Sequence, residues 1–129
     1  MLELDRGPLG VAPNHIAQRM RLYAMDAWVR DAAVLTDAAR LSGALRAAAD
    51  AGGATVVGEE FYAFPNGAVT GVLLLAQSHL SVHTWPELGL ANVDLLSCGD
   101  IDGDLVLRTI RVRLGVERAS VHCIVRSVG

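Results

Sequence analysis

The sequence lacks the features that would place it outside the cell or in a membrane. Only two cysteines occur in 129 residues, and Cys98 and Cys123 match no metal-binding spacing and are too few for a disulfide framework. No apolar run approaches the roughly 20 residues that a membrane helix requires, and the first residues do not resemble a secretory signal. We therefore expect no membrane partner and a reducing, cytoplasmic setting.

Clusters of positive charge are also missing. The 11 basic residues form no run longer than a pair, and the formal net charge is −3. A protein that follows a phosphate backbone needs grouped Lys and Arg side chains, so we expect no nucleic acid partner. The densest group, Arg108, Arg111 and Arg113, is interpreted as the solvent-facing side of a helix. Glycine-rich phosphate loops and the GxSxG hydrolase turn are absent from the sequence as well.

The sequence is rich in small apolar side chains. Hydrophobic residues make up 52% of the chain, charged residues 19% and aromatic residues 5%. A chain of this size and composition can bury a sizeable core, so we expect a single domain over residues 1–129. Residues 1–17 carry scattered Gly and Pro without periodicity, and they are predicted to form a loose leader or an arm over a partner.

Hydrophobic periodicity predicts strands interspersed with helices. A strand with Asp26 in its middle, expected to point outward or to be paired, is followed by a helix of about 16 residues. Thr36 is expected to cap the start of this helix, with Asp37 in its first turn, and Gly52 is expected to end it. A second helix is predicted over 102–114. The strand-like runs are 20–29, 54–64, 68–76, 80–84, 91–97 and 119–125.

The order of these elements predicts the fold class. It reads βα, then ββββ, then αβ, and consecutive strands joined by short turns must be mostly antiparallel. We therefore expect an α+β fold in two layers, with a mostly antiparallel sheet and two helices on one of its faces.

The chemically unusual stretch is 77–87, QSHLSVHTWPE, which directly follows an apolar run. A metal site is one interpretation, but His79 and His83 on one strand are about 13 Å apart along its axis. A Ser/His/Asp hydrolase is another, built from Ser78, His83 and a distant aspartate, although the sequence offers no nucleophile turn. The third is an ordinary hairpin whose polar side chains face solvent. The candidate aspartates are Asp26 and Asp94.

The same stretch carries a resemblance to a known family. The run SHLSVHTWPE at 78–87, followed by VDLLSCG at 93–99, resembles the processing-site signature of the short bacterial and archaeal S-adenosylmethionine decarboxylases. The runs GATV at 53–56 and GAVTGV at 67–72 stand at the family's spacing, and the element order over about 20–126 is also similar. The resemblance implies a proenzyme that cleaves itself and makes its own pyruvoyl cofactor.

In that family the cut precedes the serine, which here places it between Gln77 and Ser78. The Ser78 hydroxyl would attack the Gln77 carbonyl to form an ester, and loss of the Ser78 α-proton followed by hydrolysis would leave a pyruvoyl group at the start of the smaller chain. The family positions that match His83 and Thr70 assist this cleavage, by proton transfer and by polarising the carbonyl. Neither a metal nor pyridoxal phosphate is implied.

The resemblance also implies roles in the reaction that follows. A small substrate that carries an amine condenses with the ketone derived from Ser78, whose conjugated amide accepts the electrons released with carbon dioxide. Cys98 matches the family's proton donor, and we expect a partly exposed thiol there, whereas Cys123 is expected in the core. Phe64 matches the position that stacks on adenine, and Glu87 is a candidate polar contact to the ribose hydroxyls or the sulfonium side.

One departure from the family pattern affects substrate choice. The family usually has Glu before the processing serine, whereas this sequence has Gln77. Only the backbone carbonyl of this residue takes part in the cut, but losing a negative charge beside the site changes recognition of a cationic substrate. S-adenosylmethionine, the source of the aminopropyl donor for polyamine synthesis, is the leading substrate. The alternatives are ornithine, arginine or an amino acid of a specialised pathway.

Two expectations concern other copies of the chain. Some family members are inactive regulatory homologues that bind a working partner, but Ser78, His83, Thr70 and Cys98 are all present here. The predicted fold leaves one sheet face uncovered, and the family forms dimers, so we expect a homodimer of processed protomers or a higher homo-oligomer.

Overall fold

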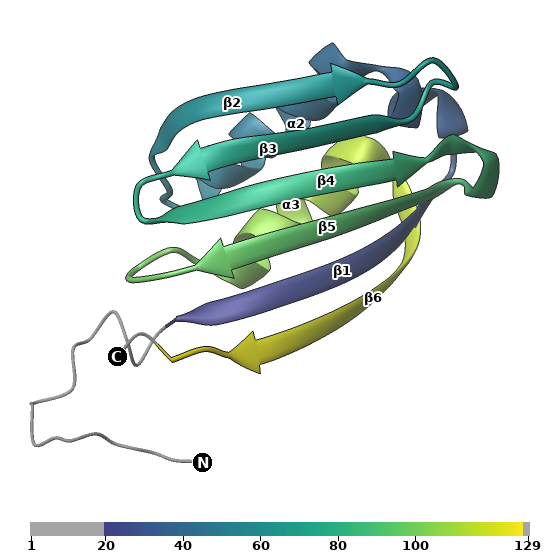
Figure 1. Cartoon of the computed structure of the whole chain (residues 1–129). Coiled ribbons are helices and arrows are strands. Elements are labelled where there is room, and N and C mark those ends of the chain that lie inside the picture. Colours follow the sequence, from purple (N-terminus) through teal and green to yellow (C-terminus); the bar gives the residue numbers. More distant parts are fainter. Residues whose placement is uncertain (1–19, 128–129) are drawn as a thin grey trace, which may run out of the picture.

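The computed structural model describes residues 20–127, so the predicted leader at 1–17 lies outside the described residues. Figure 1 shows the arrangement of the strands and helices. In chain order the elements are β1 Arg21–Val29, η1 Ala32–Thr36, α2 Ala38–Ala51, β2 Val56–Ala63, β3 Val69–Leu75, β4 Ser78–Trp85, η2 Pro86–Leu88, β5 Leu90–Ser97, α3 Gly103–Leu114 and β6 Val116–Val125.

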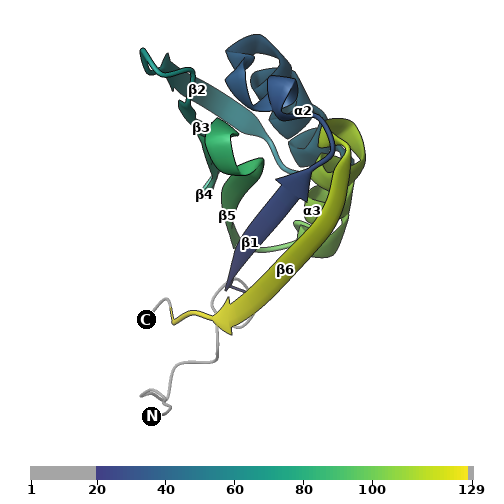
Figure 2. The same ribbon diagram turned by 90° about the vertical axis from the view of Figure 1, so that its right-hand side faces the viewer.

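The strands form one 6-stranded sheet in the order β2-β3-β4-β5-β1-β6, and every neighbouring pair is antiparallel. Both α-helices lie on the same side of this sheet, and the other side is bare (Figures 1 and 2). The predicted α+β class, the two layers and the element order are therefore confirmed.

The core lies between the sheet and its helices. Successive strand residues point to opposite faces, so every second side chain on the central strands is buried against α2 and α3. Leu80 of β4 and Leu95 of β5 are fully buried, as are Leu41 of α2 and Ile110 of α3. Burying each such side chain stabilises the fold by roughly 1.5–3 kcal/mol. We call the bare side the open face; His83 and Asn92, which are register partners, lie on it.

The start of α2 differs from the sequence prediction. Thr36 does not cap the helix, because it ends the short helix η1 and its hydroxyl donates a hydrogen bond to the Ala33 carbonyl at 3.1 Å. Asp37 is the N-cap, and its carboxylate accepts the Arg40 backbone N–H at 3.0 Å. The helix ends at Ala51 with Gly52 as C-cap, as predicted.

Cys123 was expected in the core, and this prediction is wrong. Its side chain is exposed, because β6 is an edge strand whose second half extends beyond the helices, as Figure 2 shows. The expected solvent face of α3 is confirmed, since Arg108, Arg111 and Arg113 are all exposed. None of the helices within residues 20–127 combines the length and apolar character needed to span a bilayer.

Candidate active site

A tight turn holds the predicted cleavage position. Leu75 of β3 pairs with Ser78 of β4, so only Ala76 and Gln77 join the two strands. Gln77 has φ 62°, and it is the sole non-glycine residue with positive φ in the part of the chain that the structure describes. A residue with a Cβ is strained in this left-handed region by about 1–2 kcal/mol. The peptide bond before Ser78 therefore follows a strained residue.

Cys98 lies against that same peptide group. Its thiol donates a hydrogen bond to the Gln77 carbonyl oxygen, with 3.3 Å between sulfur and oxygen. The contact is possible because β4 and β5 pair up to His79 and Leu96, which brings the end of β5 beside the start of β4. The predicted partial exposure of Cys98 is wrong: the residue is 6% exposed. A buried donor aimed at this oxygen stabilises negative charge that develops on it.

The Ser78 hydroxyl has an unusual environment. Its oxygen is buried and has no hydrogen-bond partner, the sole side-chain atom of this kind within residues 20–127. An unpaired buried hydroxyl costs about 1–3 kcal/mol, and such groups occur where a reaction uses them. This hydroxyl and the carbonyl that Cys98 contacts belong to consecutive residues. The arrangement therefore suits attack of the hydroxyl on that carbonyl.

A second group of predicted site residues lies on the open face. The Thr70 hydroxyl and His83 Nδ1 are 2.7 Å apart, and the two residues are register partners on β3 and β4. The Phe64 ring lies edge-on to the His83 ring, with 6.2 Å between the ring centroids. Phe64 is 39% exposed, so its ring is accessible to a flat ligand. Glu87 is exposed on η2, immediately after the end of β4.

The two groups are separated within one chain. Ser78 and His83 are five residues apart on β4, which corresponds to about 17 Å along the strand. They also differ in direction, because Ser78 shares the parity of buried Leu80 and His83 belongs to the open face. The Ser/His/Asp hydrolase arrangement considered from the sequence is therefore not assembled within this chain.

Tyr23 is a titratable residue near this end of the sheet that the sequence did not single out. It pairs with Leu95 on β5 and lies against Gly103 at the start of α3. Burial, followed by the nearby Asp104 carboxylate, raises its pKa above the usual value of 10.0. The alternation of side chains along this apolar strand predicts that Tyr23 is buried. The identity of its neighbours, however, depends on how α3 packs and could not be predicted from the sequence.

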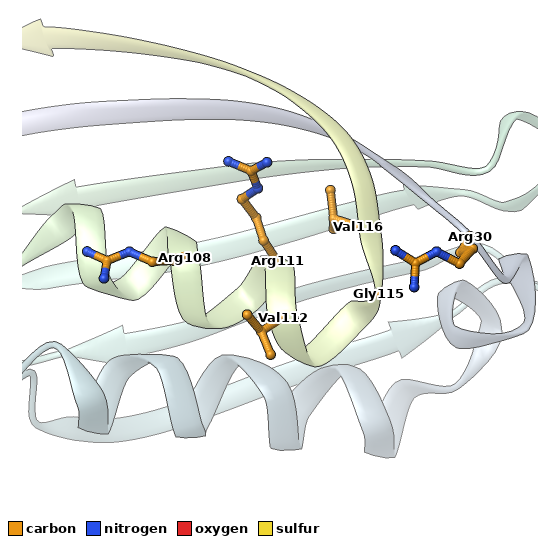
Figure 3. Close-up of a pocket in the computed structure, with 6 residues that line it drawn as sticks. All are labelled: Arg30, Arg108, Arg111, Val112, Gly115 and Val116. Atoms are coloured by element: carbon orange, nitrogen blue, oxygen red, sulfur yellow. The ribbon is translucent and has the colours of Figure 1, made fainter.

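A hollow elsewhere on the surface lacks reactive groups. It has a volume of about 370 Å³ and lies between the end of α3 and the start of β6 (Figure 3). No hydroxyl, thiol, imidazole or carboxylate lines it, so it does not supply a second candidate for the reaction. The residues that line it are Arg30, Arg108, Arg111, Val112, Gly115 and Val116. Within residues 20–127, no group of at least three His, Cys, Asp or Glu side chains could hold a metal ion.

Comparisons with known proteins show which family the chain resembles. The family model for S-adenosylmethionine decarboxylase matches residues 21–127. The chain is 40% identical to the S-adenosylmethionine decarboxylase proenzyme of Pseudomonas paraeruginosa (strain DSM 24068 / PA7) over 77 residues. These 77 residues are 59% of this chain and 48% of that protein. The proenzyme of Prochlorococcus marinus (strain MIT 9313) is 49% identical over 70 residues, 54% of this chain and 56% of that protein. The chain thus spans about half the length of the curated relatives it matches.

A solved structure extends the likeness to the fold. The crystal structure of the adenosylmethionine decarboxylase from Aquifex aeolicus VF5 superposes with a TM-score of 0.76 and 30% sequence identity. The alignment covers 88% of this chain and 95% of that one. Together with the match of the family model to residues 21–127, this likeness shows that the chain belongs to the S-adenosylmethionine decarboxylase family.

Proposed function

We propose that this chain is the proenzyme of a pyruvoyl-dependent S-adenosylmethionine decarboxylase and that it cleaves itself between Gln77 and Ser78. One observation carries the proposal: the Cys98 thiol contacts the Gln77 carbonyl directly before a buried, unpaired Ser78 hydroxyl. The family match and the names of the relatives support the choice of substrate.

The proposed cut needs only groups of the chain and one water molecule. Ser78 Oγ bonds to the Gln77 carbonyl carbon and gives up its proton, and the Cys98 thiol stabilises the oxyanion. The Gln77–Ser78 amide bond then breaks, its nitrogen takes up that proton, and an ester and a free amine are left. A base then removes the Ser78 α-proton, and the ester bond breaks to release the Gln77 carboxylate. Water displaces ammonia from the resulting dehydroalanine and leaves a pyruvoyl group. Strain at Gln77 favours the first step, because breaking the peptide bond relaxes the turn.

The residues around Ser78 fit such a group. A pyruvoyl group supplies a ketone that takes up the substrate amine and accepts electrons when carbon dioxide leaves. The contact of Cys98 with the Gln77 carbonyl supports the proposal that its thiol delivers a proton to the substrate carbon. Phe64 is proposed to stack on the adenine ring and Glu87 to contact the ribose or the sulfonium side.

The position of Phe64 and Glu87 relative to Ser78 leads to a proposal about assembly. His83, with Thr70 and Phe64 against it, lies near one end of β4, and Glu87 follows that end on η2. Ser78 and Cys98 lie at the other end. If a second copy packs over the open face in antiparallel orientation, the His83 group of each protomer comes to lie beside Ser78 and Cys98 of its partner. We therefore propose a homodimer in which each site uses both chains.

Denaturing mass spectrometry tests the cleavage. The intact chain of 13.6 kDa is expected to split between Gln77 and Ser78 on incubation, and the smaller fragment is expected to begin with a pyruvoyl group. The Ser78→Ala variant is expected to stay intact, and the matched Ser81→Ala variant on the same strand to split like the unmodified chain. A single uncut mass after prolonged incubation of the unmodified chain would contradict the proposal.

A carbon dioxide assay then tests the reaction. The cleaved protein is expected to release labelled carbon dioxide from carboxyl-labelled S-adenosylmethionine. Parallel assays with ornithine and arginine are expected to stay at background. Treatment with sodium borohydride, which reduces the ketone, is expected to abolish activity. Release from ornithine or arginine but not from S-adenosylmethionine would overturn the choice of substrate while leaving the cleavage intact.

A further inference from the structure

A line of side chains crosses the open face, joined by two hydrogen bonds and ending in a ring contact with His83. Asp26 of β1, Asn92 of β5 and His83 of β4 are consecutive register partners, so their side chains form one row across the sheet. Trp85, two residues after His83, points to the same face. The row thus connects the first strand of the domain to the imidazole proposed to assist cleavage.

Hydrogen bonds fix the orientation of each member. The Asn92 amide nitrogen donates to an Asp26 carboxylate oxygen at 2.8 Å, and the Asn92 amide oxygen accepts from the Trp85 indole N–H at 2.6 Å. An ionised carboxylate only accepts and an indole N–H only donates, so the amide can satisfy both partners in one orientation alone. Asp26 therefore sets the orientation of Asn92, and Asn92 sets that of the Trp85 ring.

The Trp85 ring in turn lies against His83. The centroids of the two rings are 4.5 Å apart, with an interplanar angle of 73°. Trp85 is 40% exposed, so burial alone does not hold its ring in place. On its other sides the imidazole is bonded to Thr70 through Nδ1 and flanked by Phe64. The His83 ring is thus held from several directions at once.

We infer that Asp26, Asn92 and Trp85 are positioning residues for His83. They keep the imidazole in the rotamer in which Nδ1 faces Thr70 and Nε2 stays free to exchange a proton with the reacting serine of the partner protomer in the proposed dimer. The inference rests on the proposed self-cleavage for its kinetic consequence, but the placement of the ring can be measured without it. Because the row lies on the open face, outside the core between sheet and helices, its loss is expected to leave the fold intact.

The kinetic test uses Asn92→Ala, which breaks both hydrogen bonds of the amide. We expect self-cleavage to slow by about 3- to 100-fold, the range expected when a proton-transferring group is misplaced. Trp85→Phe keeps an aromatic ring beside His83 but removes the N–H donor, and it is expected to slow cleavage less. Ser120→Ala is the matched control, since Ser120 pairs with Asp26 in the same row but makes none of these bonds. It is expected to cleave at the unmodified rate.

The second readout is the nitrogen spectrum of the imidazole. In a Ser78→Ala background, which cannot cleave, the two ring nitrogens of His83 are expected to report one dominant tautomer. Adding Asn92→Ala is expected to average the tautomers, whereas adding Ser120→Ala leaves the spectrum unchanged. The chain has four His residues, and loss of one set of signals in His83→Gln assigns the spectrum.

The outcomes separate the inference from the proposed function. Normal cleavage of Asn92→Ala, together with an unchanged His83 spectrum in a folded protein, would overturn the positioning role. If the unmodified chain never cleaves, the proposed function fails, and the spectra alone then decide whether the row orients His83. If Asn92→Ala does not fold, Trp85→Phe provides the same comparison with the ring retained.

Discussion

At the scale of single residues, the unusual chemistry of this chain converges on one peptide bond. The bond follows a strained residue, its carbonyl accepts from a buried thiol, and the next residue has an unpaired buried hydroxyl. The strained residue and the unpaired hydroxyl each cost stability in an ordinary hairpin. Their coincidence is explained if the Gln77–Ser78 peptide bond is the site of self-cleavage.

The contact between Cys98 and Gln77 predicts a role for the thiol before any substrate is bound. We expect Cys98→Ala to slow self-cleavage by about 10-fold or more, because removing an oxyanion donor typically costs 10²–10³ and a thiol is a weaker donor than an amide. Cys98→Ser retains a donor and should lose less. The exposed Cys123 offers the matched control, since Cys123→Ala should cleave normally. Equal rates for Cys98→Ala and the unmodified chain, by time-resolved mass spectrometry, would show that the contact is incidental.

Gln77 predicts a change in substrate affinity. The residue is exposed in the turn, and after the proposed cut its side chain would lie beside the new chain terminus. We expect Gln77→Glu to lower KM for cationic S-adenosylmethionine by about 2- to 5-fold at low salt, with kcat nearly unchanged, because an exposed charge pair is worth at most about 1 kcal/mol. Raising the ionic strength should remove the difference. A salt-independent change would point to a steric cause instead.

Tyr23 predicts alkaline sensitivity. Burial and the Asp104 carboxylate raise its pKa above 10.0, so the folded chain holds the phenol proton more tightly than the unfolded chain does. The resulting stabilisation is complete below the unfolded pKa and is lost as pH rises through 10.0 toward the higher folded value. Urea denaturation from about pH 9 to pH 11 should show that the free energy of unfolding declines less for Tyr23→Phe than for the unmodified chain. Parallel declines would assign the alkaline loss to other groups.

At the scale of elements, the start of α2 predicts a measurable capping energy. Asp37→Ala removes the acceptor for the Arg40 N–H and should lower the free energy of unfolding by about 1 kcal/mol. Asp37→Asn retains an acceptor and should recover most of the loss. Urea denaturation in the Ser78→Ala background, where processing cannot interfere, measures both. A larger loss for Thr36→Ala than for Asp37→Ala would return the cap to Thr36.

The sequence could predict the elements but not every residue at their ends. Thr36 and Asp37 are both good capping residues, and the choice between them depends on contacts distant in sequence. The buried Thr84 hydroxyl donates to the Leu35 carbonyl at 2.8 Å and accepts the Val69 N–H at the same distance, which ties η1 to the sheet. No local pattern around Thr36 contains that information. Local patterns were therefore enough to predict antiparallel strands joined by short turns. They were not enough to predict the short helix η1, which depends on the contacts of Thr84.

The candidate site was predictable to a similar degree. The resemblance identified Ser78 and Cys98 together, and the structure brings the Cys98 thiol to the adjoining carbonyl. The resemblance also identified His83. The row from Asp26 through Asn92 could not be predicted in this way, because it depends on the strand register, and a shift by one residue would move these side chains to the other face. The burial of Cys98 and the exposure of Cys123 depend on how far the helices extend over the sheet, which spacing along the chain does not determine.

At the scale of the whole molecule, the main feature is a sheet with helices on one face only. The open face carries apolar as well as polar side chains, and Leu74, which pairs with His79, is 52% exposed there. Covering these side chains in a dimer would bury apolar area that the single chain leaves in water. The same packing would unite the two clusters at the ends of β4.

Leu74→Glu tests whether the open face is the dimer interface. A charge at this position should be tolerated by the single chain but should disfavour burial, so light scattering is expected to give a mass near 13.6 kDa instead of twice that value. Val112→Glu is the matched control, because Val112 is 78% exposed on the outer side of α3. It should leave the dimer intact. A dimeric Leu74→Glu protein would place the interface elsewhere.

Complementation tests whether each site uses both chains. Ser78→Ala cannot form the ester but keeps His83, and His83→Ala keeps Ser78 but lacks the imidazole. Each variant alone is expected to cleave poorly or not at all. In a mixture, a His83→Ala chain paired with a Ser78→Ala chain meets an intact imidazole across the interface, because the two ends of β4 are about 17 Å apart within a chain. We therefore expect mass spectrometry to show cleavage of the His83→Ala chain only in the mixture, and less of it when Leu74→Glu is added to both chains. Cleavage of neither chain in a verified mixed dimer would mean that Ser78 and His83 must belong to the same protomer, which the extended β4 does not permit without refolding.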